Sequence, residues 1–371
     1  MSRDTRAVIS SGALRHNLQV ARHAARGARI LAVIKANGYG HGLLRVARAL
    51  SDADAFAVTC LEEAVPLREA GFVHPILLLE GVFEPAELDV VARYRLDLVV
   101  HSPWQLELLE YQNGTRPLSV WLKVDSGMHR LGFTPEEVPA AVERLRACRG
   151  VGPHIRYMTH LACADDREDG MTRMQLSNFT QALNGLRGER SLANSAGLLG
   201  WPEVLADWVR PGIMLYGASP FIDGLHPRPD LRPAMTLRSR LIAIKQVPEG
   251  ATVGYGATFR CPETMPVGVV AIGYGDGYPR HAGTGTPVLV NGLETQLVGR
   301  ISMDMLTVDL RGLEDRVRVG DPVTLWGDGL PIERVAEHAG TIAYELLCGV
   351  TRRVHVEEAR DSHHGPGPYP V

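Results

Sequence analysis

Short apolar, β-branched runs alternate with longer amphipathic segments along residues 11–217, and this alternation constrains the fold most. Segments with helical spacing, such as 42–50 and 171–188, separate the apolar runs. The runs with the length and composition of strands are 30–35, 55–60, 75–81, 96–101, 118–124, 154–161, 190–194 and 209–217. Eight strands that alternate with helices predict an α/β fold whose N-terminal part is a (β/α)₈ barrel of the TIM type.

A segment rich in Pro and turn residues, 218–233, ends this pattern. Beyond it the helical spacing nearly disappears, and apolar runs such as 241–247, 267–273 and 322–326 alternate with Gly, Pro, Asn and Asp. We therefore expect a barrel domain over 1–233 and a C-terminal, mostly β domain over 234–358. The last residues, 359–371, have no apolar periodicity and predict a flexible tail.

The charge and cysteine content exclude several classes of partner. A formal net charge of -3 provides no basic surface of the kind that neutralises several phosphates, so we expect no nucleic-acid partner. No apolar run reaches the length of a membrane helix and no secretory signal opens the chain, so we expect a cytoplasmic protein without a membrane partner. Five scattered cysteines without CxxC spacing argue against a disulfide framework or a zinc site, and no metal-ligand spacing appears.

Polar residues follow several of the expected barrel strands, at the end where barrels of this type hold their active sites. They are Lys35, Lys123, His160, Asn194, Ser195 and Arg210. Lys35 has two interpretations, a side chain that carries its charge to the surface or an amine that forms a Schiff base. Ser195 and the Gly212–Ile213 backbone fall in the loops after strands seven and eight, where barrels often bind phosphate. A reactive lysine beside a phosphate site suggests pyridoxal phosphate (PLP) as cofactor.

Seven segments carry a more specific resemblance. They are AVIKANGYGHG (32–42), WLKVDSGMHRLGF (121–133), LANSAG (192–197), VRPGIMLYG (209–217), VGYGATF (253–259), AIGYGDGYPRH (271–281) and GRISMDM (299–305). In this order, across nearly the whole chain up to residue 358, they resemble bacterial alanine racemase, a PLP enzyme of fold type III. The resemblance implies an isomerase that interconverts L-alanine and D-alanine. Such an enzyme serves D-alanine biosynthesis for peptidoglycan or D-alanine catabolism, and both roles stay open.

The resemblance implies two catalytic bases. Lys35 would form the Schiff base with PLP and act on one face of the substrate, while Tyr255, from the second subunit of a homodimer, would act on the other. His160 would assist Tyr255 and contact Arg210, which would face the ring nitrogen of the cofactor. Without the resemblance, a histidine such as His160 is more often a buried residue with satisfied hydrogen bonds.

The resemblance also assigns the remaining contacts. Arg130 would bind the cofactor's phenolic oxygen and the substrate carboxylate, although an arginine at such a place is often only a surface ion pair. Met303 and Asp304 would complete the substrate site. The cofactor would further contact Tyr39, Asn194, Ser195, Gly212, Ile213 and Tyr344. The entrance would be lined by Tyr274, Arg280, Arg300 and Ile342 together with Tyr344. Lys123, a second lysine near Arg130, would be carbamylated by CO₂.

Two other functions are compatible with a PLP barrel. A non-catalytic PLP-binding carrier protein would be a single barrel, whereas this chain continues for more than a hundred residues into a domain that contains Tyr255, Met303 and Tyr344. A fold-type III amino-acid decarboxylase would have to release the carboxylate as CO₂, which the carboxylate-binding role of Arg130 disfavours. Racemisation is therefore the expected activity.

Overall fold

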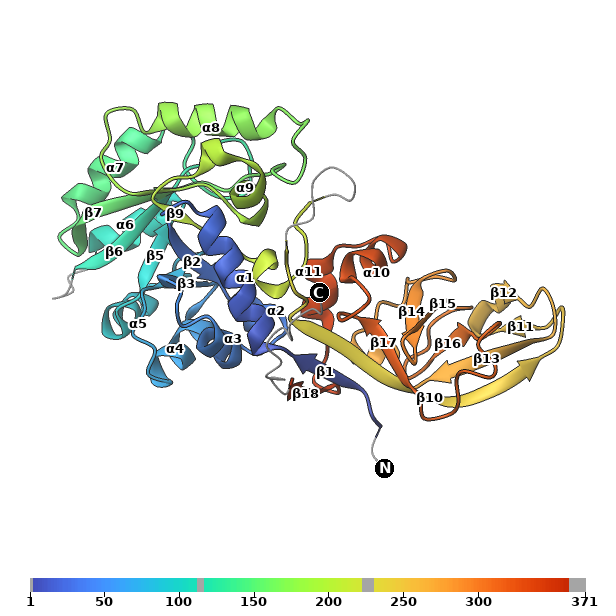
Figure 1. Ribbon diagram of the computed structural model, residues 1–371. Helices are drawn as coiled ribbons and strands as arrows, with labels where there is room; N and C mark the ends of the chain where they lie inside the picture. Colours follow the sequence, from blue (N-terminus) through green and yellow to red (C-terminus); the bar gives the residue numbers. More distant parts are fainter. Residues whose placement is uncertain (1–2, 112–116, 222–229, 360–371) are drawn as a thin grey trace, which may run out of the picture. The chain divides into compact units, whose positions relative to one another are not determined.

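The computed structural model describes residues 3–111, 117–221 and 230–359 (Figure 1). The chain divides into two compact units. The barrel unit is Arg15–Leu231, and the β unit combines Met1–Leu14 with Arg232–Val371. Part of the expected linker, 222–229, and nearly all of the expected tail, 360–371, lie outside the described residues.

The barrel unit contains a closed ring of eight parallel strands in its described part, which confirms the expected fold. In chain order these strands are β2 (Arg29–Val33), β3 (Ala55–Val58), β4 (Ile76–Leu78), β5 (Asp97–Val100), β6 (Leu118–Lys123), β7 (Val151–Met158), β8 (Arg190–Ser191) and β9 (Trp208–Val209). Pairing of Ile30 with Val209 closes the ring. Strand β3 is buried at every residue, as expected for a parallel strand covered on both faces.

The eighth strand is much shorter than the expected run 209–217. Strand β9 ends at Val209, and Pro211, which lacks a backbone N–H, follows Arg210. Ile213–Tyr216 then form a 3₁₀ turn. The end of β9 therefore becomes a loop, which brings backbone N–H groups to the rim of the barrel.

Helices follow most of the strands of the barrel unit, and Figure 1 shows them outside the ring. They are α3 (Leu43–Ala49), α4 (Leu61–Glu69), α5 (Glu87–Tyr94), α6 (Pro103–Tyr111), α7 (Val138–Ala147), α8 (Met171–Ala182) and α9 (Ser195–Gly200), while α1 (Ser11–Ala24) precedes β2. The short element α2 (Lys35–Tyr39) differs from the others, because its backbone is left-handed. No helix in the described ranges is long and apolar enough to cross a lipid bilayer.

The β unit is built on a mixed sheet, which confirms the mostly β second domain. Its strands are β1 (Arg6–Ile9), β10 (Met235–Val247), β13 (Met265–Val270), β14 (Pro287–Val290), β15 (Leu293–Gln296), β16 (Leu306–Asp309), β17 (Pro322–Trp326) and β18 (His355–Glu358). Strand β10, the long yellow strand of Figure 1, pairs with β1, β13 and β17. Two short helices, α10 (Ile332–His338) and α11 (Ala343–Gly349), accompany the sheet.

The N-terminal segment belongs to this sheet and not to the barrel. Strand β1 pairs with β10 in antiparallel and with β18 in parallel orientation. The expected barrel domain, 1–233, therefore begins later in the structure, because residues 1–14 group with the β unit.

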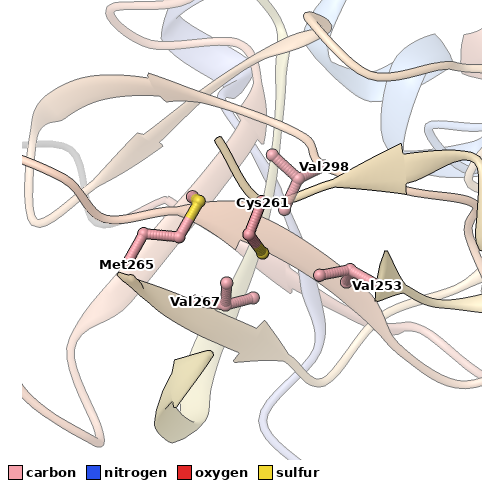
Figure 2. Packing of buried hydrophobic residues seen from close by; sticks show 5 residues of the cluster. All are labelled: Val253, Cys261, Met265, Val267 and Val298. Carbon is pink, nitrogen blue, oxygen red and sulfur yellow. The ribbon is translucent and has the colours of Figure 1, made fainter. Parts of the chain in front are cut away.

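A small apolar cluster supports the hairpin that carries Tyr255. The hairpin is formed by β11 (Thr252–Val253) and β12 (Phe259–Arg260). The cluster consists of the buried side chains of Val253, Cys261, Met265, Val267 and Val298, which Figure 2 shows gathered around Cys261. The cluster fixes both ends of the hairpin, so the position of its tip does not depend on Tyr255 itself.

Candidate active site

Lys35 lies at the rim of the barrel, directly after the buried strand β2. The next four residues, Ala36, Asn37, Gly38 and Tyr39, have φ angles of 54°, 54°, 61° and 50°. Four left-handed residues in a row make one turn of left-handed helix, which costs roughly 1–2 kcal/mol for each residue that has a Cβ. Strain of this kind persists only where the surrounding structure enforces it and is common at functional sites.

Tyr39, Ser195 and Gly212 meet at the loops after β8 and β9. The Gly212 N–H donates to Ser195 Oγ at 2.9 Å, and the Gly197 N–H donates to the side chain of Asn194 at 2.9 Å. A Cβ placed on Gly212 would lie 2.6 Å from Tyr39 Oη, so only glycine allows this approach. A phenol, a hydroxyl and backbone N–H groups thus converge at the loops where barrels often bind phosphate.

Arg210 is buried beneath these loops. Its Nη1 donates to Ser191 Oγ at 2.6 Å, and its Nη2 donates to the carbonyl oxygens of Leu192, at 3.2 Å, and of Thr159. Burial lowers the pKa of Arg210 to about 10, so the guanidinium stays positive at neutral pH. The neutral acceptors orient the cation without cancelling its charge.

His160 lies beside Arg210 and stays uncharged at neutral pH. Arg210 Nη2 is 3.5 Å from His160 Nδ1, and because an arginine only donates, Nδ1 is the acceptor and the neutral ring carries its proton on Nε2. Burial, and then the charges of Arg210, Lys123 and Arg130, place the pKa of His160 well below its ordinary value.

Lys123 joins the same group of cations. Burial, and then the charges of Arg210, Arg130 and Lys35, together lower its pKa to about 8, while Glu80 acts in the opposite direction. Arg130 is exposed, on a loop closed by a hydrogen bond from the Phe133 N–H to the Lys123 carbonyl oxygen. Lys35, Lys123, Arg130 and Arg210 therefore form a concentrated positive field at the rim. An anionic, phosphorylated cofactor such as PLP fits this set of residues, because its charge would offset the mutual repulsion.

The β unit presents the other predicted residues on exposed loops. Tyr255, in a single 3₁₀ turn at the tip of its hairpin, is 68% exposed, and Met303 and Ile342 are 52% and 61% exposed. Tyr274 and Tyr344 also belong to the exposed large apolar residues. Exposed large apolar side chains of this kind are common on surfaces that another molecule covers.

Arg280 and Arg300 line one depression of the β unit. Arg300 also supports the hairpin that carries Tyr255, since a Cβ on Gly256 would lie 2.9 Å from its Nη1. The structure therefore brings these two predicted entrance residues together and places one of them beside the predicted base.

Asp276 organises the loops of Tyr274 and Met303, and sequence reasoning missed it. Its carboxylate is fully buried and accepts two hydrogen bonds from Arg3, both at 2.6 Å, and one from the Gly273 N–H. The Gly275 N–H donates to the Met303 carbonyl oxygen at 2.9 Å, which joins the two loops. The only visible signal was an Asp among the glycines of GYGDGY, while its partner Arg3 lies 273 positions away.

Asp304, expected at the substrate site, has a structural contact in the same group. Its carboxylate binds Arg353 at 2.6 Å, and Arg353 also approaches Asp276. Asp304 therefore connects the Met303 loop to the C-terminal part of the β unit.

We expect Asp276→Ala to lower the free energy of unfolding by about 2–4 kcal/mol, because a buried acceptor of charged hydrogen bonds is lost. Urea denaturation of the variant and of the matched control Asp304→Ala, whose carboxylate is 51% exposed, measures the difference. An equal loss of unfolding free energy in the two variants would show that the burial of Asp276 makes no difference to stability.

Comparisons with known proteins agree with this arrangement. Residues 9–220 match the family model "Alanine racemase, N-terminal domain", and residues 234–357 match "Alanine racemase, C-terminal domain". An alanine racemase of Halorhodospira halophila is 58% identical over 96% of this chain and 98% of its own length, and one of Nitrosococcus oceani is 56% identical over 94% and 97%. The crystal structure of biosynthetic alanine racemase from Pseudomonas aeruginosa has a TM-score of 0.93 and 47% identity over 96% of this chain and all of that one. The chain belongs to the alanine racemase family.

Proposed function

We propose that this chain is a PLP-dependent alanine racemase that works as a homodimer with shared active sites. The observation that carries the proposal is the group of cations around Lys35 at the barrel rim, beside the convergence of Tyr39, Ser195 and Gly212. The family membership supports the same reaction, the interconversion of L-alanine and D-alanine. We further propose a cytoplasmic location, where D-alanine would be made for peptidoglycan or broken down.

The residues at the rim would hold PLP through its charged groups. The resemblance assigns to this task Lys35, Tyr39, Arg130, His160, Asn194, Ser195, Arg210, Gly212, Ile213 and Tyr344. When bound, PLP draws electrons from the substrate Cα and makes its proton acidic. Arg210 retains its own proton, because its pKa of about 10 leaves it protonated at neutral pH. It would therefore donate to the cofactor ring without transferring a proton to it.

Racemisation requires two proton-transfer groups on opposite faces of one carbon. One group removes the proton from Cα, and the other supplies a proton from the opposite face. Lys35 is the group we assign to the barrel side, and Tyr255 of the partner subunit is the group we assign to the other. His160 and Arg210 would assist Tyr255, because a positive field nearby favours the phenolate.

The exposed loops of the β unit support the dimer. Tyr255, Met303 and Ile342 are more than half exposed, yet two of them are apolar and the third is a proposed base. Contact with a second copy would cover these residues and complete the site. Met303 would then bind the substrate carboxylate together with Arg130, and the entrance residues would restrict the side chain. An extra methylene in such a pocket costs about 1–3 kcal/mol, which favours alanine.

The activity is tested by incubating the PLP-loaded protein with L-alanine. Chiral chromatography should detect D-alanine, and the reaction should end at equal amounts of the two enantiomers. Release of CO₂ would indicate a decarboxylase instead. Absence of both products, with PLP still bound, would indicate a carrier protein.

We expect Lys123 to be carbamylated, because a lysine with a pKa of about 8 is partly neutral near neutral pH and only the neutral amine attacks CO₂. The amine nitrogen forms a bond to carbon and releases a proton, so a cation becomes an anion beside Arg130. ¹³C NMR in ¹³C-bicarbonate should show a carbamate signal that decreases as the pH falls below about 8, where the amine is protonated. The control Lys123→Met should lack it. A wild-type spectrum without the signal would contradict the modification.

A further inference from the structure

A buried histidine holds the end of the left-handed turn after Lys35. The side chain of His41 is completely buried, and its Nδ1 lies 2.8 Å from the Tyr39 carbonyl oxygen and 3.1 Å from the Gly38 carbonyl oxygen. Because carbonyl oxygens only accept hydrogen bonds, Nδ1 carries the proton and donates to both. His41 thus binds the last two residues of the turn through one N–H.

The surroundings keep His41 neutral and immobile. Burial lowers the pKa of His41 to about 4, although the two carbonyl contacts act in the opposite direction. Its Nε2 is buried and has no hydrogen-bond partner within the described part of the chain. The ring packs 4.8 Å from the ring of Tyr216, which in turn stacks on Tyr39 at 4.5 Å. The imidazole therefore acts here as a fixed donor and not as a group that exchanges protons.

Other residues hold the first half of the same turn. The side chain of Asn37 accepts from the Leu43 N–H at 2.9 Å, and the Asn37 N–H donates to the carboxylate of Glu63 at 3.3 Å. Both of these contacts are made by Asn37, in the first half of the turn. The side chain of His41 reaches further along the turn, to the carbonyl of Tyr39, the residue whose φ of 50° is unfavourable for a large side chain.

The position of Tyr39 depends on that unfavourable angle. Its hydroxyl lies so close to Gly212 that a Cβ there would be 2.6 Å away. If Tyr39 relaxed to an ordinary backbone conformation, its side chain would leave the loops after β8 and β9. We propose that His41 is a positioning residue, which clamps the turn through Nδ1–H and so holds Tyr39 at the phosphate end of the cofactor site. This role rests on the proposed use of PLP.

Two carboxamide variants separate the hydrogen bond from the packing of the ring. In His41→Asn the amide nitrogen takes the place of Nδ1, whereas in His41→Gln it lies one bond further out, near the place of Nε2. Both variants lose the imidazole next to Tyr216, so that loss is common to them. PLP is titrated into the apo form of each full-length protein, and borohydride trapping measures how fast Lys35 bonds to it.

We expect His41→Asn to bind PLP within about threefold of wild type and His41→Gln at least about tenfold more weakly, as the loss of one buried hydrogen bond requires. At saturating PLP, the KM for alanine should be unchanged in both variants, since His41 does not reach the substrate. If the two variants bind PLP with equal affinity, whether weakly or normally, the proposal that His41 clamps the turn through Nδ1–H is wrong. If wild type itself neither binds PLP nor racemises alanine, the proposed function fails, and the role of His41 fails with it.

Discussion

Replacing Lys35 by alanine is expected to lower kcat for alanine racemisation by roughly 10⁴-fold, because the same amine anchors the cofactor and transfers a proton. The side chain is half-buried and lies two residues beyond the end of strand β2, outside the buried core, so its removal should leave the barrel folded. The loss is measured by following the appearance of D-alanine from L-alanine at saturating PLP.

The chain offers a clean control for this experiment. It has only three lysines, Lys35, Lys123 and Lys245, and Lys245 is exposed on β10 of the β unit. Lys245→Ala should retain full activity. Borohydride reduction of the wild-type protein followed by peptide mapping should place the PLP adduct on Lys35. An adduct on Lys123, or more than a tenth of wild-type kcat in Lys35→Ala, would contradict the assignment.

Tyr255→Phe should reduce racemisation by roughly 10²–10⁴-fold, since it removes only the acidic hydroxyl of one base. The apolar cluster below the hairpin leaves the phenyl ring in place. With two bases, each enantiomer loses its Cα proton to a different group. In D₂O the variant should therefore still exchange the Cα proton of one enantiomer, while exchange in the other falls with racemisation.

The control for this variant is Tyr111→Phe, which removes a phenol that is 82% exposed on α6 of the barrel unit. It should exchange both enantiomers at the wild-type rate. Equal loss of exchange for L-alanine and D-alanine in Tyr255→Phe would show that a single base serves both faces.

Local patterns predicted the strands of the barrel because each of them is a continuous buried run between turn residues. They failed where the structure depends on distant pairing. Strand β1, the four residues Arg6–Ile9, pairs with strands more than two hundred positions away, and nothing in its own sequence separates it from the barrel. The helices α10 and α11 have seven residues each, too few to show a helical period among strands.

The barrel residues of the candidate site could be predicted because they end strands, and the family pattern supplied the others. The position of His41 could not be predicted, since a left-handed turn cannot be recognised from residue types when it includes Ala36 and Tyr39. Asp276 and Arg3 were missed because their ion pair joins residues that are 273 positions apart in the sequence. Residues that position others through such contacts become visible only in three dimensions.

Mixing the two inactive variants tests the shared active site most directly. When Lys35→Ala and Tyr255→Phe subunits exchange freely, about half of the dimers contain one of each, and in these dimers one of the two sites has both bases intact. The mixture should therefore recover about a quarter of wild-type activity, although neither variant alone is active. A mixture that stays inactive after confirmed subunit exchange would place both bases in the same chain and contradict the account.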